Sequence, residues 1–172
     1  MFGRPKKFLF SLAALSLGVS CGEPRATAPK PTSLSQSSGR TLVECPGNTG
    51  TSTSSVIGLL GGGLQIGATS VAIPNGALTT PTLIQLTIPP SRFMEIDVTA
   101  VGFSSFLFQT PITVTIDYSR CSRGDIDKQT LHVYHIDPLT KQLLEDMGGI
   151  DDKSSRRITF TTGHLSGYAV AN

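Results

Sequence analysis

The sequence predicts an all-β protein that folds as an antiparallel β-sandwich, and three observations support this. Thr82–Ile88 alternates apolar and polar residues, which is the period-two pattern of a strand with one buried face. Ile112–Ile116 repeats the alternation more clearly, with threonines between the apolar positions. Short apolar runs recur about every ten residues, and no helical period is sustained after residue 20. This spacing is typical of a sandwich rather than of βαβ units.

The first twenty residues have the pattern of an export signal peptide. Basic residues at positions 4, 6 and 7 precede an apolar run, Phe8–Val19, and small residues stand at Gly18 and Ser20. This order of charge, apolar core and small residues is what a signal peptidase recognises. The apolar run is also shorter than the ~20 residues that a membrane-spanning helix needs. We therefore expect residues 1–20 to be removed on export.

Cys21 stands at the expected cleavage point, where a bacterial lipoprotein carries its acylated cysteine. Gly18 occupies the position where a lipobox usually has leucine, so plain secretion remains an alternative to lipidation. Several acyl chains anchor firmly, because each buried CH₂ contributes about 0.8 kcal/mol. The sequence thus predicts an exported protein that is anchored to a bacterial membrane (at the outer membrane, periplasm or cell surface) or else secreted.

Residues 21–54 are predicted to be a flexible tether that follows the acylated cysteine. The segment is rich in proline, serine and threonine and has little apolar surface to bury, so ordering it is unfavourable. Leu42, Val43 and Cys45 are the exceptions, and a first edge strand at residues 39–55 is left open. The folded domain is expected to span residues 55–172.

Within that domain the chain reads as strands separated by turns. Pro74-Asn75-Gly76 is a turn, because proline fixes φ near −65° and Asn-Gly tolerates positive φ. Residues 118–130 are polar and predicted to form a loop. The expected strands are Leu64–Ile66, Val71–Ile73, Thr82–Ile88, Phe93–Val98, Val101–Phe108, Ile112–Ile116, Leu131–Ile136, Gln142–Met147, Arg157–Thr161 and Gly167–Ala171.

Charge argues against one class of partner. The chain has a formal charge of +2, but from residue 21 onward there are 11 Lys and Arg against 12 Asp and Glu. Nucleic-acid binding needs a basic face that neutralises phosphates. We therefore expect no nucleic-acid partner.

Two cysteines remain besides Cys21. An even pair in an exported protein suggests a disulfide, so Cys45 and Cys121 are predicted to form one. The alternative is two separate free thiols, because sequence alone cannot place their Cβ atoms within reach.

No motif for a cofactor or metal ion is present. The cluster Gly58–Gly67 lacks the lysine, the glycine register and the following helix of a phosphate site. His132 and His135 are three apart in an expected strand, so they fall on opposite faces and cannot chelate one metal. The loop aspartates at positions 125, 127, 137, 151 and 152 lack the order of a calcium loop. We expect no cofactor and no metal.

The segment Gly62-Gly63-Leu64, followed by the run from Val71 to Leu78, resembles the ZU-five domain, a β-sandwich of ankyrins, netrin receptors, a zonula occludens scaffold protein and bacterial surface proteins. Phe106–Ile116 and the ending from His164 to Val170 resemble its later strands. The resemblance covers roughly residues 55–171. Its motif residues here are Gly62, Gly63, Ile73, Pro74, Gly76 and Ala77.

The resemblance also implies a possible reaction. Some members of the family cut themselves at His-Phe-Ser, and His164-Leu165-Ser166 is similar, with leucine in place of phenylalanine. The Ser166 hydroxyl would attack the Leu165 carbonyl while His164 removes the proton, and water would then release the ester. The alternative is that Ser166 only starts the final strand and His164 packs or caps it.

Together these observations favour a non-catalytic, lipid-anchored interaction module of the cell envelope that docks with a protein or a glycan through loops or sheet edges. A self-processing domain that cleaves between Leu165 and Ser166 is the first alternative. A small exported domain that binds a metal or ligand is the second. Fold resemblance by itself assigns none of these functions.

Overall fold

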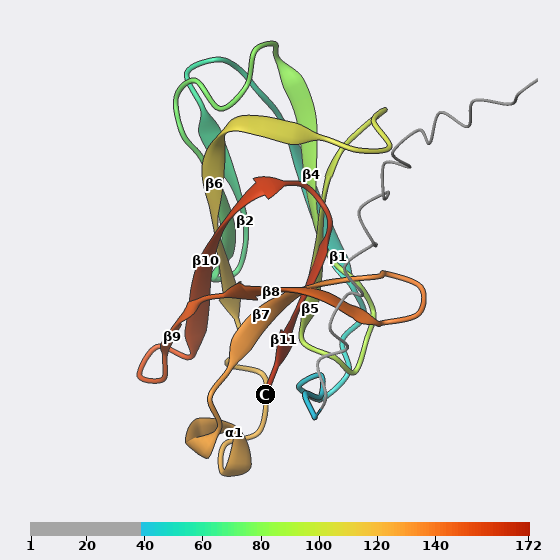
Figure 1. The fold of residues 1–172 in the computed structure, drawn as a ribbon, viewed down its shortest axis with the longest axis vertical. Coiled ribbons are helices and arrows are strands. Elements are labelled where there is room, and N and C mark those ends of the chain that lie inside the picture. The colour runs from blue at the N-terminus through green and yellow to red at the C-terminus, as the bar shows by residue number, and fades with distance from the viewer. Residues whose placement is uncertain (1–38) are drawn as a thin grey trace, which may run out of the picture. The chain divides into compact units, whose positions relative to one another are not determined.

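The computed structural model describes residues 39–172, and these form an antiparallel β-sandwich of two sheets (Figure 1). The expected signal peptide, Cys21 and the first part of the tether lie outside the described residues. Within the described residues, no helix has the length and apolar character needed to cross a membrane. The all-β sandwich predicted from the strand spacing is confirmed.

One sheet has six strands in the order β1-β4-β5-β11-β7-β8, and the other has five in the order β2-β3-β6-β10-β9. Within residues 39–172 a single short helix, α1 (Asp125–Lys128), interrupts the loop that follows β6. The strands are β1 (Thr51–Ile57), β2 (Gly62–Ile66), β3 (Thr69–Ile73), β4 (Thr82–Ile88), β5 (Glu95–Ala100), β6 (Leu107–Asp117), β7 (His132–Ile136), β8 (Leu143–Gly148), β9 (Ile150–Asp152), β10 (Arg157–His164) and β11 (Gly167–Ala171).

The core lies between the two sheets and follows the period-two pattern. In β6, Ile112, Val114 and Ile116 are fully buried while the threonines between them face outward. Strand β4 contributes Ile84 and Leu86 to the same core from the other sheet. Because successive side chains of a strand point to opposite faces, each alternating run packs one face inward.

Strand β11 is buried on both faces, unlike the alternating strands. Tyr168 and Val170 point into the main core, whereas Ala169 and Ala171 face a second cluster on the outer side of the sheet. Leu42 packs against this outer cluster and pairs with Ala171. The segment around residue 42 therefore covers a sheet face that would otherwise be exposed.

The folded part begins earlier than the expected boundary at residue 55. Strand β1 starts at Thr51, and Val43 and Cys45 are already buried. Backbone hydrogen bonds tie this segment to β11 and to the chain just before β5. Val43 N–H donates to Val170 O at 2.8 Å, and Val43 O accepts from Met94 N–H at 3.0 Å. Of the expected tether, residues 41–54 thus belong to the packed domain.

Two expected strands are displaced. Val101–Phe108 was expected as a strand, but residues 101–106 form a turn region and β6 begins at Leu107. The expected strand Phe93–Val98 begins later, at Glu95, and runs on to Ala100. Phe103, Phe106 and Phe108 instead form a chain of edge-to-face ring contacts with centroids 5.4 and 5.2 Å apart.

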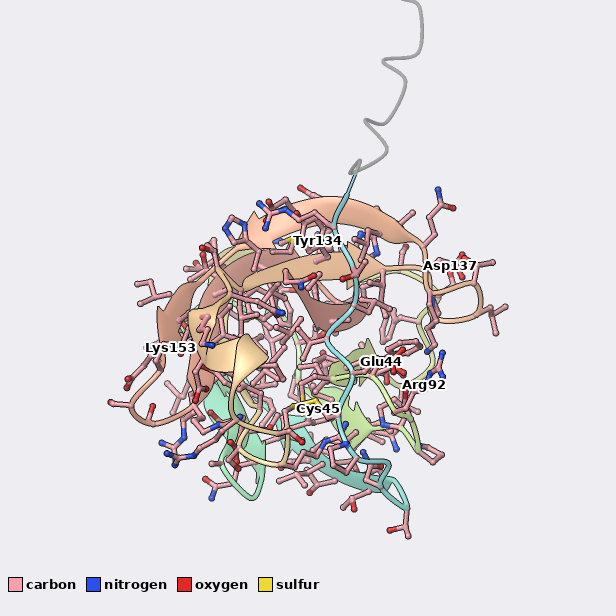
Figure 2. All side chains as sticks on the ribbon, turned by 90° about the horizontal axis from the view of Figure 1, so that it is seen from below. Glu44, Cys45, Arg92, Tyr134, Asp137 and Lys153 are labelled. Carbon is pink, nitrogen blue, oxygen red and sulfur yellow. A yellow bond between two sulfur atoms is a disulfide. The ribbon has the colours of Figure 1, made fainter. Side chains whose placement is uncertain are left out.

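A disulfide joins Cys45 to Cys121, as the even pair of cysteines predicts. It fastens the segment before β1 to the loop after β6, across a sequence separation of 76 residues. Nearby, Arg92 forms an ion pair with Glu44 at 3.5 Å, and Arg120 donates hydrogen bonds to the carbonyls of Pro46 and Phe93 (Figure 2). These links hold residues 44–46 against the sandwich.

Reducing the disulfide should lower the free energy of unfolding by about 4 kcal/mol, because it closes a long loop in the unfolded chain. The measurement is urea unfolding of the full-length protein with and without a thiol reductant. The Cys45→Ala/Cys121→Ala double variant is the control, and the reductant should leave its midpoint unchanged. Equal midpoints for the oxidised and reduced wild-type protein would contradict this role of the bridge.

Candidate functional site

The glycines of the sequence motif serve close backbone packing. A Cβ atom on Gly63 would lie 2.9 Å from the Val71 carbonyl oxygen, and one on Gly62 would lie 3.1 Å from Ile57 Cδ1. Gly76 has a φ angle of 78° and donates its N–H to the Leu59 carbonyl at 2.9 Å. Ile73 and Ala77 are buried on either side of the turn. The motif therefore joins β2, β3 and the Pro74-Asn75-Gly76 turn into one unit.

The predicted catalytic pair lies where the chain crosses between the sheets. His164 ends β10 in the five-stranded sheet, and Gly167 starts β11 in the six-stranded sheet, so Leu165 and Ser166 form the link. Both link residues are held by the backbone. Leu165 N–H donates to Phe106 O at 3.2 Å, and Ser166 O accepts from Val98 N–H at 3.0 Å.

The buried hydroxyl of Tyr168 organises this crossover. It donates to the His164 carbonyl oxygen at 2.5 Å, and it lies 3.1 Å from the Thr162 hydroxyl and 3.2 Å from His164 Nδ1. The side chain is completely buried, and this burial raises the pKa of Tyr168 to about 12. The phenol therefore stays protonated and keeps its donor at physiological pH.

The His164 ring is engaged away from Ser166. Its Nδ1 faces the Tyr168 hydroxyl, and its Nε2 lies 3.7 Å from Glu145 Oε2. The hydrogen bonds among the described residues include none between the ring and the Ser166 hydroxyl. The positive-φ residues other than glycine are Lys141 and Arg156, so the link residues show no left-handed strain. The sequence pairs His164 with Ser166, two positions further along the chain, and the described hydrogen bonds of the His164 ring go to Tyr168 and not to Ser166.

A second imidazole, that of His135, joins the His164 ring from another strand. The ring centroids of His135 and His164 are 5.1 Å apart, and ligand atoms of His135, Glu145 and His164 all lie within 4.8 Å of one another. Burial, followed by the nearby His164 ring, lowers the pKa of His135. These are the described residues that could hold a metal ion.

His132 lies on the opposite face of β7 from His135, as the odd spacing predicts. It forms an ion pair with Asp146 at 2.9 Å, and Tyr134 donates to the same carboxylate at 3.0 Å. Hydrogen bonds from a backbone N–H, His132 and Tyr134 lower the pKa of Asp146, although its partial burial acts against them. His132 therefore has its own partner outside the His135 cluster.

Two of the loop aspartates hold their own turns. Asp137 accepts backbone hydrogen bonds from Leu139 and Thr140. Asp152 is the acceptor for Ser154 and Ser155, whose hydrogen bonds lower its pKa strongly. Both carboxylates act as turn-forming groups.

One end of the sandwich exposes a group of large apolar side chains, which we call the apolar end. Its members lie at the end of β1, at the start of β4 and in the loops that follow β1 and β5. This end of the sandwich is at the top of Figure 1. Val56 is paired directly with Leu83, whose carbonyl accepts the N–H of Val101 at 2.9 Å. The apolar end consists of Val56, Leu59, Leu60, Leu83, Val101 and Phe103.

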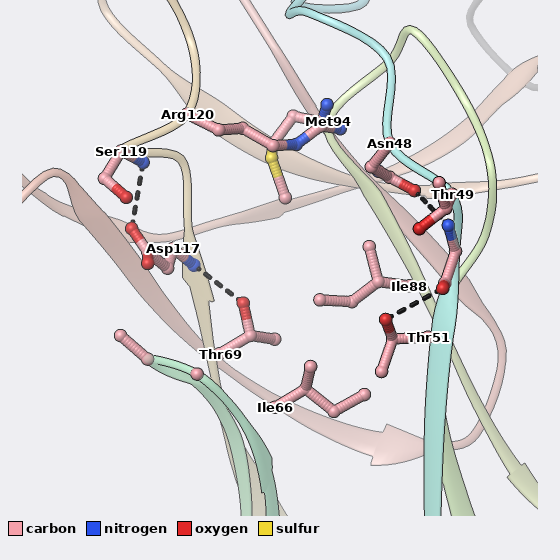
Figure 3. Close-up of a pocket in the computed structure, with 13 residues that line it drawn as sticks. Asn48, Thr49, Thr51, Ile66, Thr69, Ile88, Met94, Asp117, Ser119 and Arg120 are labelled. Atoms are coloured by element: carbon pink, nitrogen blue, oxygen red, sulfur yellow. Dashed lines mark hydrogen bonds between the residues drawn. The ribbon is translucent and has the colours of Figure 1, made fainter.

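A pocket of about 210 Å³ lies at the opposite end of β1 (Figure 3). Ile66, Ile88 and Met94 give it an apolar lining. Some of its polar groups are already paired: Asp117 accepts from Ser119 N–H at 2.9 Å, and Thr69 Oγ1 accepts from Asp117 N–H at 3.1 Å. Asn48 Nδ2 and Arg120 Nε, on two further lining residues, are buried without a hydrogen-bond partner among the described residues.

Comparison with protein-family models and with curated protein sequences finds no match to this chain. The resemblance to the ZU-five domain therefore stays a prediction.

The sequence did not predict the roles of Glu145 and of the apolar end. The charge-free composition around the apolar end was a visible signal for it, whereas Glu145 had none, because its role depends on the pairing of β8 with β7.

Replacing Tyr168 by phenylalanine should lower the free energy of unfolding by about 1–3 kcal/mol, because the His164 carbonyl and ring would lose a buried partner. Chemical unfolding of the two proteins measures this difference. Tyr134→Phe is the matched control, since its hydroxyl contacts a partly exposed carboxylate that water can solvate. Equal losses for the two variants would show that Tyr168 has no special role in the crossover.

Proposed function

We propose that this chain is a non-catalytic interaction module of the bacterial cell envelope, anchored through lipid on Cys21, which binds a partner protein through its apolar end. The observation that carries the proposal is a set of exposed large apolar side chains on the strand ends and loops of one end of the sandwich, where Val56 is paired with Leu83 and Leu83 is hydrogen-bonded to Val101. Leu60 is 85% exposed, Val56 is 65% exposed and Phe103 is 59% exposed. Clustered exposure of this kind marks interaction surfaces, whereas scattered apolar residues do not.

The sequence around the apolar end contains no formal charge. Residues 46–91 and 98–116 include no Asp, Glu, Lys or Arg. Charged side chains are concentrated in the remaining segments, at residues 92–97 and 117–157. A partner would therefore meet an apolar centre with a rim of serine and threonine, and long-range attraction between charges would contribute little.

This chemistry favours a protein over a membrane or a glycan. Surfaces that bind anionic lipid carry Lys or Arg, and the apolar end has neither. Glycans are recognised through hydrogen-bonding groups, which aliphatic and phenyl side chains do not offer. A partner protein with its own uncharged apolar patch would bury Leu60 and Phe103 and so remove their apolar surface from water.

The proposal predicts a partner contact that depends on Phe103. A photoreactive amino acid at Leu60 in the full-length protein in cells should give one discrete crosslinked protein, and adding Phe103→Asp should reduce that adduct severalfold. The same amino acid at Ser154, an exposed turn residue, is the control and should not give the adduct. Unfolding measurements establish that Phe103→Asp remains folded.

Three outcomes would contradict the proposal. The first is the absence of a discrete adduct, and the second is an adduct that persists in the Phe103→Asp variant. The third is crosslinking to lipid, or to a second copy of this chain, in place of another protein.

We further propose that the β10–β11 crossover is structural and not self-cleaving. Support comes from the hydrogen bond between His164 Nδ1 and the Tyr168 hydroxyl and from the backbone hydrogen bonds on both link residues. Ser166 then only leads into the final strand, which begins at Gly167.

The intact mass of the purified full-length protein should therefore correspond to one uncleaved chain that starts at Cys21, with or without acyl groups. Ser166→Ala should leave that pattern unchanged. A pair of fragments that meet at Leu165 and Ser166 in the wild type, and that disappear in Ser166→Ala, would overturn this proposal and make the chain a self-processing domain.

A further inference from the structure

Three side chains that can bind a metal ion meet at one edge of the sandwich. They come from three different strands: His135 from β7, Glu145 from β8 and His164 from β10. Strands β7 and β8 belong to one sheet and β10 to the other, and both contact β10 (Figure 1). The cluster therefore bridges the two sheets where the core gives way to solvent.

Strand register explains how residues far apart in the sequence converge. His135 is directly opposite Glu145 in the β7–β8 ladder and opposite Tyr168 in the β7–β11 ladder, so all three share one face. Tyr168 lies in the core between the sheets, which shows that this face is the inner one. The inner face here carries two imidazoles and a carboxylate in place of apolar side chains.

Irregular pairing aims these side chains at one another. The β7–β8 ladder shifts register next to His135, and the β10–β6 ladder shifts between Thr162 and His164. Register shifts of this kind redirect side chains that a regular ladder would keep in rows, and they are common beside functional sites.

The hydrogen bonds around His164 leave its Nε2 free as a ligand. Tyr168 donates its proton to the His164 carbonyl at 2.5 Å, so the phenol oxygen is an acceptor toward Nδ1 at 3.2 Å. The ring is then the Nδ1–H tautomer, with the lone pair on Nε2. That atom faces Glu145 Oε2 at 3.7 Å. A buried partner that fixes the tautomer in this way is the usual outer support of a metal-binding histidine.

The cluster is otherwise short of partners. Among the described residues, neither the His135 ring nor the Glu145 carboxylate makes a hydrogen bond to the protein. The 3.7 Å between His164 and Glu145 also exceeds the length of a good hydrogen bond. Hydrogen bonds among these three side chains therefore do not explain why they lie together.

We propose that His135, Glu145 and His164 bind a divalent transition-metal ion, with zinc as the best match. Two imidazole nitrogens favour zinc over calcium or magnesium, which prefer oxygen ligands. Three protein ligands with a fourth position open to water form a known class of zinc site.

The distances allow the site to close around the ion. Tetrahedral zinc with bonds near 2.0–2.1 Å places its ligand atoms about 3.3 Å apart, whereas these atoms lie within 4.8 Å of one another. Glu145 has a side chain that is 61% exposed and lies on the edge strand of its sheet. It has room to swing inward by the required distance.

The test is zinc titration of the untagged full-length protein by calorimetry, after removal of bound metal with a chelator. We expect one Zn²⁺ per chain. His135→Gln and Glu145→Gln should each weaken binding by at least about tenfold, which is the lower end of the typical effect of outer-shell changes at metal sites. His132→Gln is the matched control, because His132 lies on the same strand but pairs with Asp146 on the other face. It should bind zinc like the wild type.

Circular dichroism and thermal unfolding establish that each variant is folded. If the His135→Gln variant does not fold, Glu145→Gln still tests the proposal, because the Glu145 side chain is mostly exposed. Absence of zinc binding by the wild type would overturn the proposal. So would zinc binding that is retained in both His135→Gln and Glu145→Gln, or that is lost equally in His132→Gln. The result is independent of the apolar end, since none of these residues belongs to it.

Discussion

Strand β10 lies in one sheet and β11 in the other, so the backbone between them must leave one ladder before it can join the next. Buried polar groups that lose a ladder partner need another, or the protein is destabilised by their desolvation. Here the His164 carbonyl receives the Tyr168 hydroxyl, while the backbone groups of Leu165 and Ser166 bond to Phe106 and Val98. The crossover depends on a fully buried phenol that reaches back four residues.

That same phenol links the fold to the candidate site. Its donor goes to a backbone oxygen, which leaves its acceptor for the His164 ring and thereby fixes which ring nitrogen is free. Histidine 164 consequently presents Nε2 toward the sheet edge, where His135 and Glu145 meet it. One group, the Tyr168 hydroxyl, thus both pairs with the backbone where the chain crosses between the sheets and orients the His164 imidazole. This explains how a structural residue can position a ligand without touching the ion.

The sequence predicted those features that depend on local chemistry. The alternation of Ile112, Val114 and Ile116 places them in the core, and the Pro74-Asn75-Gly76 turn forms where its residues demand it. The expected strand over Val101–Phe108 failed because its apolar residues pack on one another in a turn, and apolar runs look alike in strands and compact loops.

Features that depend on distant pairing were out of reach of the sequence. Strand β1 is nearly all serine and threonine, and it forms because β4 offers a complementary edge, not because of its own pattern. Likewise, the spacing of His132 and His135 correctly separated them. It could not reveal that β8 and β10 would bring Glu145 and His164 to His135, since that requires both the sheet order and two register shifts.

Charge divides the sandwich into two regions with different chemistry. The residues of the apolar end come from segments without a formal charge, whereas His135 and Glu145 of the metal-ligand cluster come from the segment that carries most of the ionisable residues. A surface without charge gains little from long-range attraction, so its affinity rests on apolar contact and shape. A metal ligand set instead needs lone pairs held in a fixed direction, which buried hydrogen bonds provide. One sandwich can hold both because its two sheets share a core, while their edges and ends are free to differ.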